Sequence, residues 1–523
     1  MSRLFTFCLC CIAFTGFSAP ALAQTEPVNP DSALLSVLRT LVGSPVTLQQ
    51  ALDAALANAS TVRKSEAASA AAHGSVRREK GLFDPELFFS MNYLDQQNPT
   101  ASFFSGASVL LTTQTDSRTG LRMDLPIGTR LEASMNTVRL KTNSSFANLN
   151  PQYTAFGSLS IRQPLLGGFM ASGRRALNRS EYESDAARAR YDQAVIATSA
   201  EVERRYWDLY AAERNYAVQR VIVAQAELFQ KETEVRAGTG LAGPNQVANA
   251  RTFLAEQRLQ LIDRQEQLDR LSDQFASYIG VRPDGADARY LTVDAPPESF
   301  SVEPLDSLVE QAFRSNLELL ALRAEIDAAR SSASAAGWSV LPKLDIVGSL
   351  GGNGLGGTPR DVIFGSDTLR TSRGGSLSDA LRQVTHRDFP NWSVGLELKI
   401  PLGFRSGLGE KDRLDAEVVI AEQRYLEQSR SLEDQVRSFF RELRHGKDRL
   451  DAAREGVSAA QEQIRIGLIE FHNGRSTAFE LVRLGADYAS AQQRYSEALV
   501  RTAKASATLR QLTSGGRPAA TNP

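Results

Sequence analysis

Two long segments without proline constrain the fold of this chain more than any other feature. They span residues 174–237 and 410–473, and all 20 prolines of the sequence lie outside them. At 1.5 Å per residue, each segment forms a helix about 100 Å long. An average helix in a globular protein has only about 11–12 residues. The chain is therefore predicted to be an elongated helical protein rather than a compact globular domain.

The pattern within both segments is a heptad. Apolar residues recur at every seventh position: Val195, Val202, Leu209, Tyr216 and Val223 in the first, and Val436, Leu443, Leu450, Val457, Ile464 and Phe471 in the second. A strict seven-residue repeat keeps one seam against a neighbouring helix when the helices supercoil left-handedly. Much of the remaining surface is charged or small, so we expect antiparallel coiled-coil helices packed along a narrow seam.

The chain also contains an internal duplication. Residues recur at an offset of 257 in the strand regions and of 234 in the long segments, as in the pairs Pro85 and Pro342, Leu87 and Leu344, Val202 and Val436, and Leu209 and Leu443. Each half consists of a helix, a strand region, a very long helix and a shorter helix.

Alternating apolar and polar residues predict two strands in each half. Runs in which apolar and polar residues alternate begin at Leu87 and Tyr153 in the first half and at Leu344 and Trp392 in the second. Runs of about 9–11 alternating residues are typical of transmembrane barrel strands. Four strands cannot close a barrel, and open edges are not tolerated in lipid, so several copies must share one. Three copies give a 12-stranded barrel; two copies, giving eight strands, are not excluded by this count.

One further segment has strand character. Residues 120–139, with a turn at Pro126, Ile127 and Gly128, are interpreted as a hairpin in the external loop. The role of the two insertions, 96–150 and 351–390, is not indicated by the sequence.

The N-terminus resembles a secretory signal peptide over residues 1–23. Arg3 precedes an apolar run to Phe17, and Ala21-Leu22-Ala23 has the small-x-small pattern of a cleavage site. All three cysteines, Cys8, Cys10 and Cys11, lie within it. We therefore expect a mature chain without disulfides or thiolate metal sites.

The predicted organisation follows the duplication. A linker at 24–46 precedes the first repeat, 47–280, with strands within 86–165, a long helix at 174–237 and a return helix at 245–279. An equatorial linker at 281–304 precedes the second repeat, 305–513, with strands within 343–401, a long helix at 410–473, a return helix at 477–512, and then a disordered tail at 514–523.

Together these features resemble the TolC-family outer membrane efflux proteins over essentially the whole mature chain. The most specific residues are those of the turns after the long helices, 240–251 and 474–482. The resemblance implies an α+β membrane protein in the outer membrane, in which long antiparallel coiled-coil helices form an α-helical barrel in the periplasm and four transmembrane strands per chain contribute to the shared barrel. It implies a homotrimeric channel-tunnel, the passive exit duct of a tripartite efflux or type I secretion system. Its partners would be a periplasmic adaptor that opens the helical tip, an inner-membrane pump or ABC transporter, and outer membrane lipid.

The resemblance also implies site residues at the periplasmic tips. Glu480 takes the place of an acidic ring that narrows the entrance, while Arg483 replaces the second acidic residue. Phe471 matches an aromatic before the second turn; Ser476 stands where a gating arginine can occur, and Arg475 is one residue away. Glu480 and Arg483 are alternatively a solvated pair at i,i+3. The candidate adaptor contacts are Gly238, Gly240, Leu241, Gly474, Ser476 and Thr477, although glycine ends helices in any context.

Other functions have little support. Near-equal charges, 59 Lys+Arg against 60 Asp+Glu, provide no basic field for nucleic acid. Two segments, 238–243 and 352–357, fit the GxGxxG string, but the first follows a helix and the second lacks a crossover helix. The four histidines have no metal-ligand spacing, and no nucleophile elbow is present. We expect no enzyme activity, cofactor or metal.

The alternative function is a non-porous coiled-coil structural protein of the cell envelope, which has no use for barrel strands. The exported substrate is left open.

Overall fold

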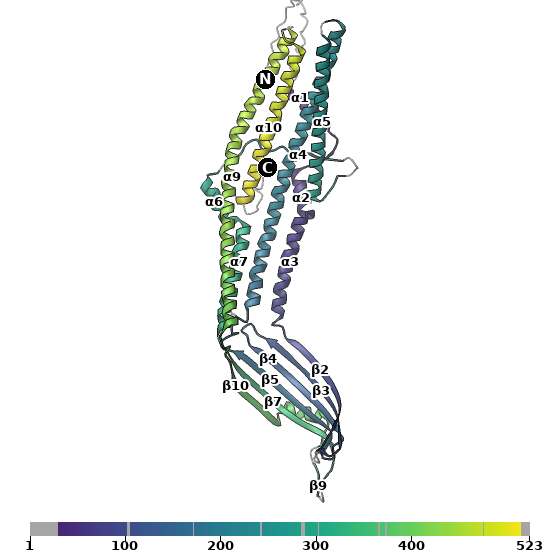
Figure 1. Ribbon diagram of the computed structural model, residues 1–523, viewed down its shortest axis with the longest axis vertical. Helices are drawn as coiled ribbons and strands as arrows, with labels where there is room; N and C mark the ends of the chain where they lie inside the picture. The colour runs from purple at the N-terminus through teal and green to yellow at the C-terminus, as the bar shows by residue number, and fades with distance from the viewer. Residues whose placement is uncertain are drawn as a thin grey trace, which may run out of the picture.

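The computed structural model describes residues 30–101, 105–170, 172–240, 243–283, 288–301, 303–364, 367–371, 374–473 and 475–513. The predicted signal peptide and C-terminal tail lie outside these residues. The described chain is elongated, with a wall of long helices that continues into a tilted sheet (Figure 1). No helix within the described ranges is both long and apolar enough to cross a membrane.

The helical wall is four helices wide. Two helices run its whole length, and shorter helices lie beside them in the order α9, α10, α4, α5 in the half far from the sheet and α9, α7, α4, α3 in the half near it (Figure 1). The bounds are α3 (Ser60–Gly81), α4 (Arg175–Gly238), α5 (Pro244–Ile279), α7 (Leu317–Val340), α9 (Arg405–His472) and α10 (Ala478–Thr513).

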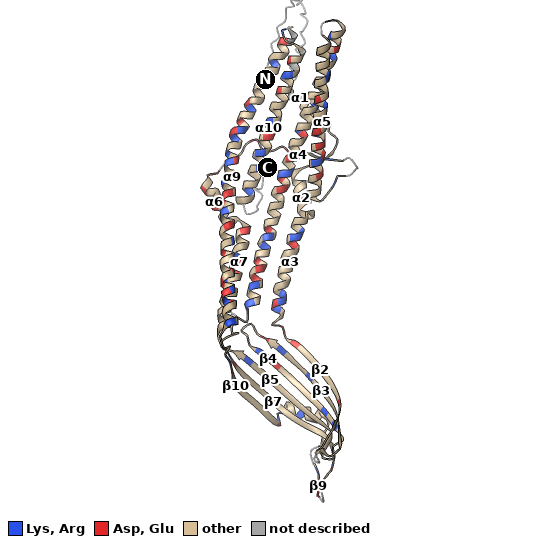
Figure 2. Cartoon of the chain, in the orientation of Figure 1, with Lys and Arg blue, Asp and Glu red and all other residues tan. Residues whose placement is uncertain are grey.

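The heptad seam forms the core of this wall. Val202, Leu209, Val436 and Leu443 are almost fully buried. Burying a Val or Leu side chain contributes about 1.5–3 kcal/mol. The predicted coiled-coil packing is thus confirmed at these positions. Charged residues remain dense along the outer surfaces of the long helices and are sparser on the strands (Figure 2).

The sheet contains six antiparallel strands rather than the four predicted. Their order is β10, β7, β5, β4, β3, β2, with bounds β2 (Glu86–Pro99), β3 (Val109–Asp124), β4 (Arg130–Thr142), β5 (Leu149–Pro164), β7 (Lys343–Pro359) and β10 (Phe389–Lys399). The sheet is open, with β2 and β10 at its edges.

The two additional strands, β3 and β4, correct the interpretation of residues 120–139 as part of an external loop. They lie between β2 and β5, and their turn is at the end of the sheet that joins the helices, where the Met170 N–H donates to the Ile127 carbonyl at 3.3 Å. The predicted hairpin turn at 126–128 is correct, but the first part of β3 was not predicted, because Thr115, Ser117 and Thr119 occupy outward positions where the strand pattern calls for apolar residues. Threonine nevertheless favours strands because its branched side chain fits a pleated sheet.

A belt of short elements crosses the wall at mid-length. It includes α2 (Leu48–Asn58), α6 (Leu305–Ser315) and the parallel pair β1 (Ser44–Val46) and β6 (Tyr290–Thr292). Helix α1 (Pro30–Arg39) packs on α4 further along the wall. The buried ring of Tyr206 from α4 packs against Phe275 at a centroid distance of 6.1 Å. The Tyr206 hydroxyl accepts from the N–H groups of Val293 and Asp294 at 2.9 and 3.0 Å. The two hydrogen bonds attach the belt to one side of the wall.

The segment between β7 and β10 forms the hairpin of β8 (Val362–Phe364) and β9 (Asp367–Leu369), followed by α8 (Leu377–His386). Helix α8 lies on β5 and β7, where Ala380 and Val384 pack against Ala155. Gly354 makes this close approach possible, because a Cβ atom there would lie only 1.9 Å from the Ala380 carbonyl oxygen.

Candidate functional site

The six-stranded sheet presents two chemically different faces. The strand register places one apolar row across all six strands: Leu87, Leu121, Ala133, Leu159, Leu350 and Trp392. Much of this face is open, with Trp392 74% and Leu396 72% exposed. Monomeric soluble proteins rarely expose apolar surface so continuously, so this face is suited to lipid contact.

The opposite face is polar and cross-linked by ion pairs. Arg122 pairs with Glu86 at 2.7 Å. Arg162 on β5 bridges Asp345 on β7 and Glu397 on β10 at 2.8 and 2.6 Å. The strands therefore combine one apolar and one hydrated face, as transmembrane barrel strands do.

The first helix tip joins α4 to α5. Gly240 has φ +77°, a left-handed conformation that glycine adopts without a steric penalty. Across the two helices, Arg251 pairs with Glu234 at 3.0 Å and Arg258 with Glu227 at 2.7 Å. Hydrogen bonds from Gln230 and Arg251 lower the pKa of Glu234.

The candidate contacts at this tip, Gly238 and Gly240, are both exposed, whereas Leu241 lies outside the described residues. The return helix begins with Pro244 in its first turn, after Gly243 at the N-cap. Proline suits this position because the first helical N–H has no partner within the helix. The described residues at this tip, 238–240 and 243, are therefore exposed and lie between two cross-linked helices.

The second helix tip joins α9 to α10. Thr477 caps α10, because its carbonyl and hydroxyl oxygens accept from the Glu480 N–H at 3.1 and 3.3 Å. The exposed residue Arg475 donates its N–H to the Glu470 carbonyl at 2.8 Å, and Ser476 is half-buried. Gly474 and the side chain of Phe471 lie outside what the structure describes.

Glu480 and Arg483 both project from the start of α10 and are exposed. A carboxylate in the first helical turn interacts favourably with the helix dipole. Within the described part of this single chain, Arg483 is paired with Asp487 at 4.0 Å rather than with Glu480. The Arg483 and Asp487 side chains are 74% and 58% exposed, and such a pair contributes about 0–1 kcal/mol. Arg483 is therefore only weakly held.

The two tips touch through aromatic side chains that the sequence reasoning missed. The rings of Phe229 on α4 and Phe479 on α10 lie 5.7 Å apart. Val482 packs beside Phe229, and Gly485 allows a close approach to Gln225. The heptad count ends at Val223, so the pattern gave no signal for Phe229. This contact holds the start of α10 against the first tip.

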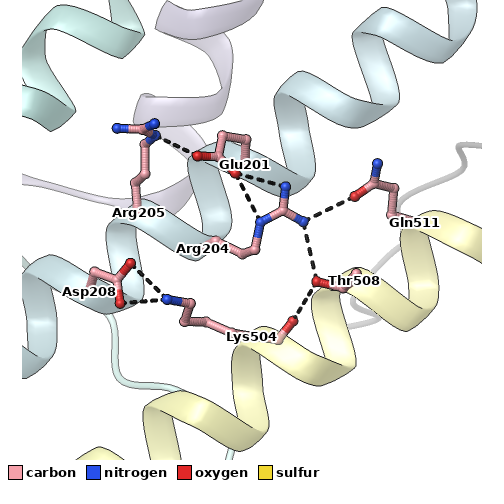
Figure 3. Close-up of polar contacts among 7 residues, drawn as sticks. All are labelled: Glu201, Arg204, Arg205, Asp208, Lys504, Thr508 and Gln511. Atoms are coloured by element: carbon pink, nitrogen blue, oxygen red, sulfur yellow. Dashed lines mark hydrogen bonds and ion pairs between the residues drawn. The ribbon is translucent and has the colours of Figure 1, made fainter. Parts of the chain in front are cut away.

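A polar network joins α4 to α10 at mid-length of the wall (Figure 3). Arg204 contacts Glu201 on its own helix and reaches Thr508 and Gln511 at 3.2 and 3.0 Å. Burial raises the pKa of Glu201, but hydrogen bonds and charge from Arg204 and Arg205 outweigh it, so the pKa lies below its usual value. The network connects the first half of the chain to the end of the second.

A second ion pair lies beside this network. Lys504 on α10 contacts both carboxylate oxygens of Asp208 at 2.7 and 2.8 Å (Figure 3). Arg204, Asp208 and Lys504 line a groove of about 920 Å³ between α4, α5, α9 and α10, together with Glu442 and Arg501. At 100° per residue, Arg204 and Asp208 lie on the side of α4 opposite Tyr206 and the belt. The wall thus has a belt side and a charged groove side.

One carboxylate on the belt side is buried. Glu213 is 5% exposed and accepts from the Thr292 N–H and hydroxyl at 2.7 and 2.9 Å. Burial raises the pKa of Glu213 to about 7, despite these hydrogen bonds. Among the described residues, no group of three or more His, Cys, Asp and Glu side chains is placed to hold a metal ion.

Comparison with known proteins agrees with this geometry. The family described as "Outer membrane efflux protein" matches residues 308–515. The outer-membrane channel OprN is similar in structure, with 16% identity, a TM-score of 0.63 and coverage of 90% of each chain. CmeC from Campylobacter jejuni has 12% identity and a TM-score of 0.63, covering 91% of this chain and 87% of its own. VceC from Vibrio cholerae has 14% identity and a TM-score of 0.62, covering 90% and 96%.

No curated protein sequence matches the chain. At 12–16% identity, the structural similarity establishes the fold. The family match independently agrees with the predicted outer-membrane location and efflux role. The resemblance to TolC-family proteins is thereby confirmed: residues 308–515 carry the outer membrane efflux protein domain, and the described chain has the fold of the outer-membrane efflux channels.

Proposed function

We propose that this chain is one of three identical subunits of an outer membrane channel-tunnel, the passive exit duct of a tripartite efflux or type I secretion system. The observation that carries this proposal is the two-faced sheet at the end of a long helical wall. Its apolar row contacts lipid, and its ion-paired face lines a hydrated path. A non-porous coiled-coil scaffold has no use for such a sheet.

The periplasmic tips form the regulated entrance. Contact of the second tip with the first includes one tilted aromatic pair, Phe229 and Phe479, and Phe479 remains 56% exposed. A periplasmic adaptor that binds the tips at Gly238, Gly240, Ser476 and Thr477 displaces the start of α10 from α4 at low cost. An inner-membrane pump or ABC transporter supplies the energy, since the duct itself is passive.

Planar-bilayer recording of the purified protein tests the proposed pore. We expect ion conductance that rises when the tip is loosened by Phe479→Ala, because the aromatic contact between α4 and α10 is lost. Leu228→Ala, which shortens a 69% exposed side chain on α4, serves as the matched control and leaves conductance unchanged. Absence of conductance from the wild type, from Phe479→Ala and in the presence of an adaptor would contradict the duct function.

A second measurement tests the entrance charge. Three Glu480 carboxylates around a pore favour cations. Glu480→Gln should therefore lower the K⁺ over Cl⁻ permeability ratio, measured as a reversal potential in a salt gradient. Glu470→Gln, an exposed carboxylate at the end of α9, is the matched control. Equal ratios for the wild type and Glu480→Gln would show that Glu480 is only a solvated surface residue.

A further inference from the structure

The width of the sheet changes the expected assembly. The additional hairpin of β3 and β4 makes the sheet of one chain six strands wide. Strand β2 runs away from the helices and β10 runs back toward them, so the two open edges point in opposite directions. When β10 of one copy lies beside β2 of the next, the pair is antiparallel, like every pair within the sheet.

The outward side of the hairpin combines apolar residues with the short hydroxyl side chains of β3, and its inward side is charged. Leu121 and Ala133 belong to the apolar row that crosses all six strands. On the polar face, Arg118 pairs with Glu132 across the hairpin, and Arg122 pairs with Glu86 on β2. The hairpin is therefore built into the sheet on both sides and does not fold as a loop over its end.

The sheet and the helical wall then have the same width. Six strands about 4.8 Å apart, tilted by about 35–45°, span roughly 35–41 Å of a barrel's circumference. Four helices about 8–10 Å apart span roughly 32–40 Å of the wall. Four strands would span only about 23–27 Å and would force the path to narrow where the helices meet the sheet.

From this match we infer that three copies close into an 18-stranded barrel that is as wide as the helical tunnel. The radius to the strand backbone is about 18 Å, against about 12 Å for 12 strands. The inference rests on the proposed trimer. The exit through the outer membrane is then unconstricted, and passage is limited at the helix tips rather than in the sheet.

The occupant of both open edges is a second copy of this chain. The unpaired N–H and C=O groups of an edge strand are not tolerated in lipid. The exposed edge strand β2 presents Phe89 and Met91 on its apolar side, and β10 presents Val394 and Leu396 on the same side of the sheet. Only another copy offers an antiparallel edge with apolar and polar faces in matching order.

Removal of the hairpin tests the inference directly. Strand β2 ends and β5 begins at the same end of the sheet, so deletion of residues 109–142 leaves a connected four-stranded sheet. The copy number is measured by mass photometry and the barrel diameter by electron microscopy of the purified oligomer. We expect three copies in both proteins, with the wild-type barrel about 1.5 times as wide as that of the variant, in proportion to strand number.

The outcomes separate this inference from the proposed function. Three copies with equally wide barrels in both proteins would overturn the 18-stranded barrel and leave the duct function intact. Two wild-type copies would give 12 strands and overturn both the inference and the proposed trimer. Lack of conductance would overturn the duct function alone.

Cysteine labelling covers the case in which the deletion variant does not fold. Single cysteines are placed at residues 115–121 of full-length chains, whose three native cysteines lie in the predicted signal peptide. If β3 is a barrel strand, a membrane-impermeant maleimide labels positions 116, 118 and 120 of the open channel and spares 115, 117, 119 and 121. Uniform labelling along the segment would contradict the inference.

Discussion

At the scale of single residues, helix α4 has buried polar side chains on one side and charged, groove-lining side chains on the other. Tyr206 and Glu213 face the belt and are buried, whereas Arg204 and Asp208 face the charged groove. The heptad pattern predicts only which apolar residues of α4 face the neighbouring helices, so it did not predict which polar residues face the belt and which face the groove. Glu213 is the residue at which this arrangement has a measurable consequence, because an ionised carboxylate there must do without most of its hydration.

Glu213 predicts that stability falls as pH rises from about 4.5 to about 7. Burial raises the pKa of Glu213 from 4.5 to about 7. Below pH 4.5 the carboxyl is protonated in both states. Between the two values the folded chain binds more protons than the unfolded chain, so the free energy of unfolding decreases as pH rises. The loss is complete above pH 7 and amounts to about 3 kcal/mol.

Glu213→Gln removes this dependence, because an amide stays neutral and still accepts from the Thr292 N–H. Thermal unfolding of the purified protein in detergent, followed by circular dichroism at pH 5 and pH 8, is the measurement. The variant should gain stability over the wild type at pH 8 and little at pH 5. Glu310→Gln, at an exposed position on α6, is the control. An equal pH dependence in Glu213→Gln and the wild type would refute the predicted role of Glu213.

At the scale of elements, the sequence predicted the parts with a strong period and missed those without one. The segments predicted at 174–237 and 410–473 correspond to α4 (Arg175–Gly238) and α9 (Arg405–His472). Only the end of β3, from residue 120, was predicted, because the outward positions before it are Thr and Ser and polarity does not alternate there. The tip contact between Phe229 and Phe479, and the network around Arg204, join residues far apart in sequence. A repeat pattern carries no information about such pairings.

The Arg204 network predicts how firmly the end of α10 is held. Arg204 reaches Thr508 and Gln511 with one guanidinium, and lysine cannot reproduce this planar fork. Arg204→Lys should speed amide hydrogen exchange in residues 504–513 by roughly tenfold, the effect of losing one or two hydrogen bonds. Arg314→Lys on α6, whose side chain is 78% exposed, should leave this exchange unchanged. Unaltered exchange in Arg204→Lys would mean that apolar packing alone holds α10.

At the scale of the whole molecule, each edge of the helical wall lies on the same side of the chain as one edge of the sheet. The wall ends in α9 on the side of β10 and in α3 and α5 on the side of β2 (Figure 1). When the α9 side of one copy contacts the α3 and α5 side of the next, repetition of this contact forms a closed ring if the rotations between copies add up to a full turn. The helical and strand layers of one chain can therefore close together, through one continuous interface.

Apolar side chains that are exposed on the wall edges are expected to stabilise the proposed ring of copies. Leu259 and Ile262 on α5 are 64% and 61% exposed, and Val419 and Ile420 on α9 are 55% and 50% exposed. Replacing Leu259 and Ile262 together with Glu places charges in the proposed interface between copies. The proposed trimer should dissociate at concentrations at least tenfold higher than for the wild type, since each buried apolar side chain contributes about 1.5–3 kcal/mol. Mass photometry over a dilution series measures the change.

The matched control for this pair is Val293→Glu, at a 59% exposed position just after β6 in the belt. It adds a charge in the belt rather than on α3, α5 or α9, the helices at the wall edges, so dissociation of this variant should equal that of the wild type. Circular dichroism of each variant establishes that the helices remain folded. If Leu259→Glu with Ile262→Glu assembled as tightly as the wild type, α5 would lie outside the interface. The apolar residues on its surface would then be available to a periplasmic partner instead of a second copy of the chain.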